Sequence, residues 1–223
     1  MHLIITRPED DALPLKAKLE AMGHSATLLP LLKIVPRQNV IIPDRPYQLI
    51  CATSANALKH VQLTSALKQT KIFTVGPQSL AAAQAAGFTS CEAHGGDVQG
   101  LVAHIKKAIP ADAAPILYLS GAETSADLQQ LLQDEHFTVD KVIVYDAVTQ
   151  KPQHLAEAIT MADGVLLYSP RSARIWVDMA DASQAASLSY FCLSANVAKA
   201  LPKHWRTFVA KTPDESAMLA LLD

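Results

Sequence analysis

The sequence lacks the common signatures of cofactor and metal binding. It contains no GxGxxG after an apolar run, no Walker loop, no HExxH and no GxSxG. Its eight histidines are scattered, and none stands at the short spacing that is typical of paired metal ligands. We therefore expect no metal site and no cofactor, and a site made of backbone amides, hydroxyls, a few cations and a tyrosine.

Charge and cysteine are also scarce. Charged residues make up 18% of the chain, the net charge is −2, and no block of like charges occurs. This argues against binding to nucleic acid or to a membrane surface. Cys51, Cys91 and Cys192 are odd in number and lie far apart on apolar runs. We therefore expect these cysteines to be buried as small hydrophobic side chains, and not to form disulfides or a zinc site.

Long apolar runs are missing as well. No run approaches the roughly 18 residues of a transmembrane helix, and the start, MHLIITRPEDD, has no signal-peptide pattern. We expect a cytoplasmic protein with no membrane partner. No long heptad pattern demands a dimer, so we expect a monomer.

Short apolar runs alternate with helical patterns along the whole chain. The runs include HLIIT, QLICA, KIFTV, PILYLS, VDKVIVY, GVLLYS, SYFCLS and TFVAK. Between them, apolar residues recur at the spacing of one helix face. Because the chain has 223 residues, it forms one large domain or two small ones. The alternation predicts parallel sheets covered by helices on both faces, an α/β architecture.

An internal repeat of two units, A and B, occurs in the order A-B-A-B. Three positions of the first unit A match three of the second at a constant separation: Leu3 with Ile116, Leu15 with Leu128, and Leu19 with Leu132. Unit B begins at CATSANAL and returns at LYSPRSAR, and its last helix opens at GGDVQGLV and at TPDESAML. We expect Asp97 and Asp214 to cap these last helices. Two five-stranded domains follow, either in tandem or nested.

Two extended segments favour the nested arrangement. The stretch from 30 to 46 carries four prolines, and YDAVTQKPQ at 145–153 also reads as extended. Two such crossings place a central domain within an outer one. The expected bounds are 1–35 with 150–223 for the discontinuous outer domain, and 40–145 for the inserted domain.

The carboxyl ends of the expected strands are the expected ligand site, because ligands bind there in open parallel sheets. These ends read TRP (6–8), TSAN (53–56), GPQS (76–79), LSGAE (119–123), YSPRS (168–172) and LSAN (193–196). They are rich in Ser, Thr, Gly and Arg and poor in carboxylates. Helix N-termini add unpaired N–H donors and partial positive charge. An anionic ligand, a carboxylate or a phosphate, is therefore expected.

Each candidate also has a purely structural explanation. Serine and threonine cap helices without any ligand. Arg7 fits a surface ion pair with Glu9 or Asp10. Arg174 fits a solvated helix face, and Tyr145, at the end of a buried strand, fits plain packing.

Ordered segments carry a resemblance to a known family. They are IITRPEDDALPLKAKLEAMGH with LLPLLKIVP, ATSANAL, TVGPQSLAAAQAAGF, GGDVQGL, LYLSG, VIVYDAV, LLYSPRSA and TPDESAMLALL. Through them the chain resembles the uroporphyrinogen-III synthase family along nearly its whole length. The resemblance implies two doubly wound parallel-sheet, flavodoxin-like domains, joined by a two-stranded linker, with the second inserted in the first.

The resemblance also implies a reaction. The linear tetrapyrrole hydroxymethylbilane is closed to uroporphyrinogen III, with inversion of ring D and loss of water, in an interdomain cleft and without metal or organic cofactor. This is a lyase step of porphyrin and heme biosynthesis. The substrate is a polycarboxylate, which matches strand ends rich in hydroxyls and amides.

The resemblance assigns roles to particular residues. Tyr145 matches the family's tyrosine at the end of VxVY and is expected to donate a proton or hydrogen bond to the departing hydroxyl. The last strand end, LSANVAKAL, departs from the loop of relatives. The expected substrate-binding residues are Arg7, Thr53, Ser54, Gly76, Ser79, Ser169, Arg171 and Asn196.

Two other functions fit the same sequence. One is a two-domain binding module that closes on a small anion and performs no chemistry. The other is an enzyme of the same family whose activity is reduced because its last loop has changed.

Overall fold

The computed structural model describes residues 1–94, 96–124 and 126–222. Gly95 of the GGDVQGL segment and Asp223, the end of the expected outer domain, lie outside the described residues. The chain forms two compact units. Unit 1 comprises Met1–Lys33 and Val148–Asp223, and unit 2 comprises Ile34–Ala147. The inserted arrangement of the two units is therefore confirmed.

Unit 1 is built around a five-stranded sheet. Its strands are β1 (His2–Ile5), β2 (Ser25–Leu28), β9 (Gly164–Leu167), β10 (Ser189–Cys192) and β11 (Arg206–Val209). Its helices are α1 (Glu9–Ala21), α7 (Leu155–Met161), α8 (Pro170–Met179), α9 (Ala182–Ala185), α10 (Ala195–Ala198) and α11 (Glu215–Leu219).

Unit 2 is built around a six-stranded sheet. Its strands are β3 (Leu32–Pro36), β4 (Leu49–Ala52), β5 (Ile72–Thr74), β6 (Cys91–Ala93), β7 (Ile116–Gly121) and β8 (Val139–Thr149). Its helices are α2 (Ala55–Lys59), α3 (Ser65–Gln69), α4 (Gly76–Ala85), α5 (Val98–Ala108) and α6 (Leu128–Asp134). Among the described residues, no helix is long and apolar enough to span a bilayer.

The two sheets share one topology. The strand order is β2-β1-β9-β10-β11 in unit 1, and β8-β7-β4-β5-β6 in unit 2, where β3 adds an outer strand beside β8. Neighbouring strands within both five-strand sets are parallel. Each structural unit therefore combines the βαβ of one repeat unit A with the three strands of one repeat unit B. The A-B-A-B repeat and the doubly wound α/β fold are therefore confirmed.

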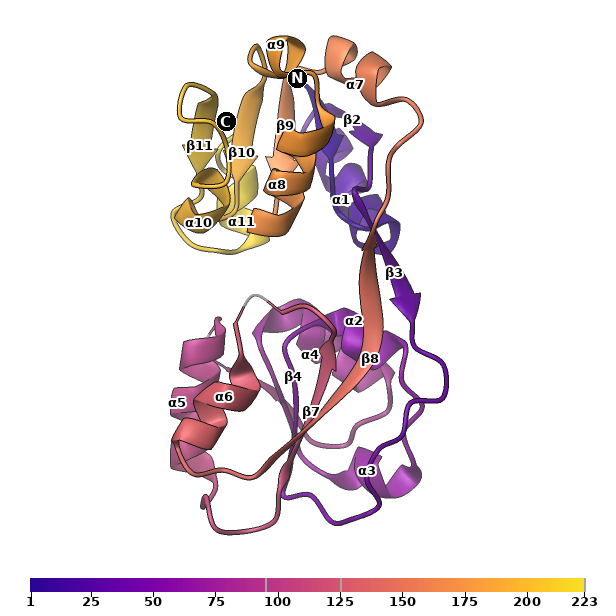
Figure 1. Cartoon of the computed structure of the whole chain (residues 1–223), viewed down its shortest axis with the longest axis vertical. Helices are drawn as coiled ribbons and strands as arrows, with labels where there is room; N and C mark the ends of the chain where they lie inside the picture. The colour runs from indigo at the N-terminus through magenta and orange to yellow at the C-terminus, as the bar shows by residue number, and fades with distance from the viewer. Residues whose placement is uncertain (95, 125, 223) are drawn as a thin grey trace. The chain divides into compact units, whose positions relative to one another are not determined.

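Helices cover both faces of each sheet, as Figure 1 shows for each unit. In unit 1, α1 and α11 pack on one face through Leu15, Leu19 and Met218, and α8 packs on the other through Trp176. In unit 2, α5 and α6 cover one face, and α2 and α4 cover the other. The apolar residues of these strands are buried on both sides, so the runs read as continuously apolar.

Side-chain caps set where several helices begin. Asp97 accepts a hydrogen bond from the Gly100 N–H at 2.8 Å, and Asp214 accepts one from the Ala217 N–H at 2.8 Å. Both N-caps expected from the repeat are therefore confirmed. They stand at equivalent helices, α5 and α11, of the two units.

The segments that connect the units are β3 and β8 (Figure 1). β2 and β3 are separate strands, because Pro30 between them has no N–H to donate to a sheet. The strand expected to end at Tyr145 instead continues to Thr149. A bidentate pair between Arg37 and Asp146, with Nε–Oδ2 2.8 Å, supports this extension.

Candidate functional site

In unit 2 the strand order reverses between β4 and β7, and ligands of doubly wound sheets bind beside such a point. Thr53 directly follows β4, and its hydroxyl oxygen lies 3.0 Å from the phenol oxygen of Tyr118 on β7. Burial raises the pKa of Tyr118, and hydrogen bonding with Thr53 and Ser120 only partly offsets that effect. The switch point of unit 2 therefore carries a protonated phenol joined to a hydroxyl.

Tyr145 lies next to this point because its strand pairs with β7. Gly121 stands opposite Tyr145 in the register of β7 and β8. A Cβ atom at position 121 would lie 2.6 Å from Cζ and 2.8 Å from the phenol oxygen of Tyr145. Real Cβ atoms do not approach so closely, so only glycine lets the ring lie there. The ring is 8% exposed.

Two serine hydroxyls at strand ends cap the helices that follow them. Ser54 caps α2 by accepting a hydrogen bond from the Asn56 N–H at 3.2 Å. Ser169 caps α8 in unit 1 by accepting one from the Ser172 N–H at 3.0 Å. A hydroxyl that accepts a bond still has its own O–H to donate. Capping and ligand binding are therefore compatible at Ser54, whereas the Ser169 hydroxyl also lies 2.9 Å from the Ser172 hydroxyl, and either of these two can be the donor.

Helix α4 begins differently. Its N-cap, Val75, makes no side-chain cap hydrogen bond, and Pro77 occupies the first turn. Gly76 has φ of +77°, a left-handed conformation that favours glycine. Ser79 is buried in the same turn. The N-cap residue thus provides no side-chain bond to the N–H groups at the start of this ten-residue helix, a helix start that suits an anion.

Arg7, which follows β1 in unit 1, forms ion pairs. Its Nη1 lies 3.1 Å from Glu215 Oε2 and its Nη2 lies 3.5 Å from Asp11 Oδ2, rather than beside Glu9 or Asp10. The guanidinium also lies over the Tyr168 ring, 4.7 Å from the centroid. Burial raises the pKa of Tyr168, which keeps this phenol neutral beside the ion pairs. The positive charge of Arg7 is therefore balanced by two carboxylates of the chain itself, those of Asp11 and Glu215.

The remaining candidates also lie near strand ends in unit 1. Arg171 is half-buried in the first turn of α8, whereas Arg174 is exposed, as a solvated face predicts. Asn196 is exposed on α10, whose N-cap Ser194 makes no side-chain cap hydrogen bond. The structure thus groups Arg7, Ser169 and Arg171 near the switch point between β1 and β9.

Two hollows on unit 2 have volumes of about 630 and 670 Å³. They are lined by the segment 37–47, by parts of β8 and α6, and by the segment 62–70 that contains α3, and neither contains a candidate residue. We therefore assign the site from strand ends and not from cavity size.

Sequence reasoning missed Tyr118 and the role of Gly121. A tyrosine inside the buried run PILYLS is a usable signal, because a buried phenol needs a hydrogen-bond partner. The role of Gly121 depends on pairing between distant segments, and no local pattern reveals it.

These features define a class of protein: a two-domain α/β protein with hydroxyls, phenols and helix N-termini at the strand ends of its parallel sheets. The family model of uroporphyrinogen-III synthase HemD matches residues 14–220. The chain therefore belongs to the uroporphyrinogen-III synthase family.

Solved structures agree with this fold. The chain is similar to uroporphyrinogen-III synthetase from Helicobacter pylori 26695, with 14% identity and a TM-score of 0.70, over 99% of this chain and 97% of that one. It is also similar to a mutant uroporphyrinogen III synthase from Thermus thermophilus, with 13% identity and a TM-score of 0.59, over 100% and 97% of the two chains. A comparison with curated proteins found no significant match.

Proposed function

We propose that this chain closes hydroxymethylbilane to uroporphyrinogen III, with inversion of ring D and loss of water. Family membership supports this reaction, which is a cofactor-independent lyase step of heme biosynthesis. The observation that carries the proposal is the group of Thr53, Tyr118 and Tyr145 at the switch point of unit 2. These side chains suit a reaction in which a hydroxyl departs.

Tyr145 acts as the donor to the departing hydroxyl. Its phenol O–H gives a hydrogen bond or proton to the leaving oxygen, which departs as water and leaves an azafulvene. The pyrrole at the far end then attacks through its substituted carbon, and a spiro intermediate forms, fragments and closes in the inverted sense. Because the pyrroles supply the electrons, the protein needs only to hold the chain in the productive shape.

The strand-end residues hold the carboxylates of the substrate. Serine and threonine hydroxyls and helix N–H groups donate to carboxylate oxygens, and arginine adds charge. The proposed binding residues are Arg7, Thr53, Ser54, Gly76, Ser79, Ser169, Arg171 and Asn196. We expect the smallest contribution from Arg7, because Asp11 and Glu215 already neutralise it.

We further propose that the chain acts as a monomer in the cytoplasm. Sedimentation equilibrium measures the first point directly, and a mass of two chains would contradict it. Fractionation of cells that express the chain tests the second.

Isomer analysis tests the proposed function. The purified protein is incubated with freshly made hydroxymethylbilane, the products are oxidised, and the type I and type III isomers are separated. We expect type III to predominate, whereas the spontaneous reaction gives the uninverted isomer. A product mixture equal to the control without enzyme would support the binding-module alternative and overturn the proposal. A slow but type III-selective reaction would indicate that the altered LSANVAKAL loop reduces activity.

A further inference from the structure

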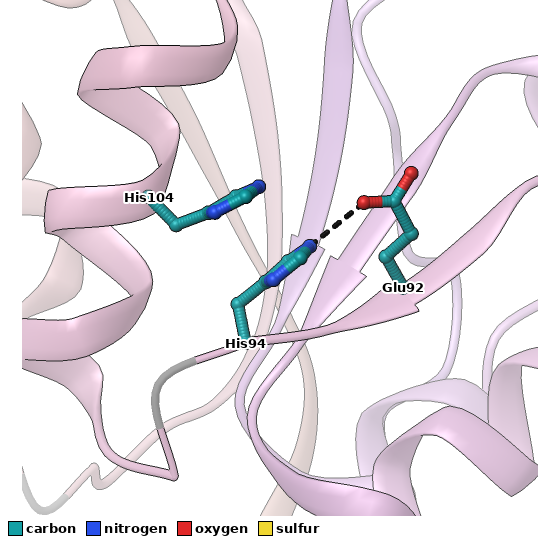
Figure 2. Close-up of side chains that lie close together, drawn as sticks. All are labelled: Glu92, His94 and His104. Carbon is teal, nitrogen blue, oxygen red and sulfur yellow. Dashed lines mark hydrogen bonds and ion pairs between the residues drawn. The ribbon is translucent and has the colours of Figure 1, made fainter.

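A cluster of two histidines and one glutamate lies at the edge of the sheet of unit 2, outside the residues proposed for catalysis. Figure 2 shows the ring of His104 over the ring of His94, with the carboxylate of Glu92 beside His94. The two ring centroids are 3.4 Å apart and the ring planes differ by 11°. One ligand atom from each of the three residues lies within 4.8 Å of the other two.

The fold explains why these residues meet. Glu92 lies on β6 and His94 directly follows it, so the period of two directs both side chains to one face of the sheet. Opposite Glu92 in register is Phe73, whose side chain belongs to the core covered by α5. His104 comes from α5, one position before the buried Ile105 and three after the buried Leu101. The cluster therefore bridges the last strand and the helix that packs on it.

The present contacts hold the donor atoms of the three side chains near one another, within 4.8 Å. Nε2 of His94 lies 2.8 Å from Oε2 of Glu92, and the other carboxylate oxygen lies 2.9 Å from Nζ of Lys71. Phe73 meets both imidazoles edge-on, with centroid distances of 4.8 and 5.1 Å. Lys71 and Phe73 thus support the three side chains from outside, as outer-shell residues do in metal sites.

We propose that Glu92, His94 and His104 bind a divalent transition-metal ion, for which Zn²⁺ is the best match. Two imidazoles and one carboxylate form a three-ligand zinc set that leaves a fourth position for water. Ligand bonds of about 2.0–2.2 Å in a tetrahedral site place donor atoms roughly 3.3 Å apart. The present spacing reaches this value through rotations of the three half-buried side chains. The ion replaces the direct contact between His94 and Glu92 and draws the stacked rings toward one centre.

This proposal departs from the expectation of no metal site, and it is independent of the ring-closing reaction, which uses no metal. The ion joins the end of β6 to α5 across the segment that begins the helix. Its role is therefore to hold this part of unit 2 together. A ligand that binds only the folded state raises the melting temperature with its concentration.

Calorimetric titration tests the proposal. Tag-free, chelator-treated full-length protein is titrated with Zn²⁺, beside His104→Gln, His94→Gln and His154→Gln. His154 is the matched control, because it also lies beside a glutamate, Glu157, with Nδ1–Oε2 3.2 Å, but on an exposed helix start. We expect one ion per chain for wild type and His154→Gln. Each of the other two substitutions weakens binding about 100-fold or more, since even outer-shell changes cost 10–100-fold.

Two further readouts decide the outcome. Co²⁺ used as a probe gives the strong visible absorption of a four-coordinate site in wild type and not in His104→Gln. The melting temperature rises with Zn²⁺ in wild type and His154→Gln, and remains constant in His104→Gln. Equal Zn²⁺ affinity of wild type and both cluster variants, or absence of binding to wild type at excess Zn²⁺, would overturn the proposal. Ring closure by the metal-free protein proceeds as before, so the two proposals fail separately.

Discussion

The two units have the same strand order and different chemistry at the same edge. In unit 2 the switch point holds three hydroxyl-bearing side chains, those of Thr53, Tyr118 and Tyr145. In unit 1 the corresponding strand ends hold Arg7, which is paired with Asp11 and Glu215. A shared topology therefore fixes where a site lies, whereas the side chains decide what it does. We therefore propose that proton donation belongs to unit 2.

The cores of the two units also differ in their tryptophan content, so tryptophan fluorescence can follow the unfolding of one unit. Both tryptophans of the chain, Trp176 and Trp205, lie in the core of unit 1 around Tyr190. The Trp176 indole N–H donates to the Tyr190 oxygen at 3.1 Å, and the Trp205 ring stacks on Tyr190 with centroids 4.7 Å apart. Tryptophan fluorescence therefore reports on unit 1, while circular dichroism reports on both units.

The largest effect is expected from a methyl group added at Gly121. In Gly121→Ala, the new Cβ displaces the Tyr145 ring, because the two would be 2.6 Å apart. We expect the free energy of unfolding to fall by about 1–3 kcal/mol, and turnover to fall about 100-fold as the phenol loses its position. Denaturant unfolding and product formation measure the two effects.

Gly164→Ala is the matched control in unit 1. Its Cβ would lie 2.7 Å from the Ser189 carbonyl oxygen and 2.8 Å from the Phe191 ring. We expect a loss of stability at least as large, because the Ser189 carbonyl belongs to the backbone and cannot rotate away, with little loss of turnover per folded molecule. If both variants lost turnover equally, the assignment of the proton donor to unit 2 would be wrong.

The next largest effect is expected when a threonine that directly follows a strand is replaced by valine, and each unit contains one such threonine. In Thr53→Val the hydroxyl bonded to Tyr118 is lost, which costs about 1 kcal/mol of stability and raises KM several-fold. In Thr6→Val the buried bond to the Leu166 carbonyl, 2.8 Å long, is lost at a similar cost while KM stays constant. Steady-state kinetics and denaturant unfolding separate the two results. An unchanged KM in Thr53→Val would show that Thr53 does not bind the substrate.

The equivalent caps of α5 and α11 test the repeat itself. Asp97→Ala and Asp214→Ala each remove one cap hydrogen bond of 2.8 Å. We expect each substitution to cost about 1 kcal/mol of stability. Circular dichroism reports both losses, and tryptophan fluorescence reports the loss from Asp214→Ala, since that cap lies in unit 1. If one substitution lowered the free energy of unfolding ten times as much as the other, the two caps would not be equivalent.

The smallest effect concerns acid stability. Burial raises the pKa of the Asp140 carboxyl, but hydrogen bonds from Arg45 and Tyr47 outweigh it, so the pKa is held below its ordinary value. The ionised carboxylate therefore adds stability above the unfolded pKa, and this stability is lost as the pH falls through the folded pKa. We expect Asp140→Asn to lose less stability than wild type between about pH 5 and 3. Equal acid sensitivity of the two proteins would contradict this.

Much of the fold follows from the sequence because its signals are local. Apolar runs such as QLICA and PILYLS are long enough to define strands, and Asp97 and Asp214 define helix starts. The edge strand β6 escapes detection, because three residues with a charged centre, Glu92, show no period. The cluster of His94 and His104 depends on that strand, so it escapes detection too.

The site follows from the sequence only in part. Hydroxyls at strand ends, such as Thr53 and Ser54, are visible because they adjoin apolar runs. Tyr118 pairs with Thr53, and Gly121 makes room for Tyr145, only after distant strands have paired. The ion pair between Arg7 and Glu215 likewise joins the two ends of the chain. Such contacts depend on topology, which local patterns do not contain.

The division of roles between the units is tested most directly by comparing kcat and KM of Tyr145→Phe and Ser169→Ala. We predict that Tyr145→Phe lowers kcat about 10–100-fold with KM nearly constant, because the donor acts in the transition state. Ser169→Ala raises KM with kcat nearly constant, because it removes a bond that binds substrate and transition state alike. An unchanged kcat in Tyr145→Phe, with type III product still formed at the wild-type rate, would contradict the account.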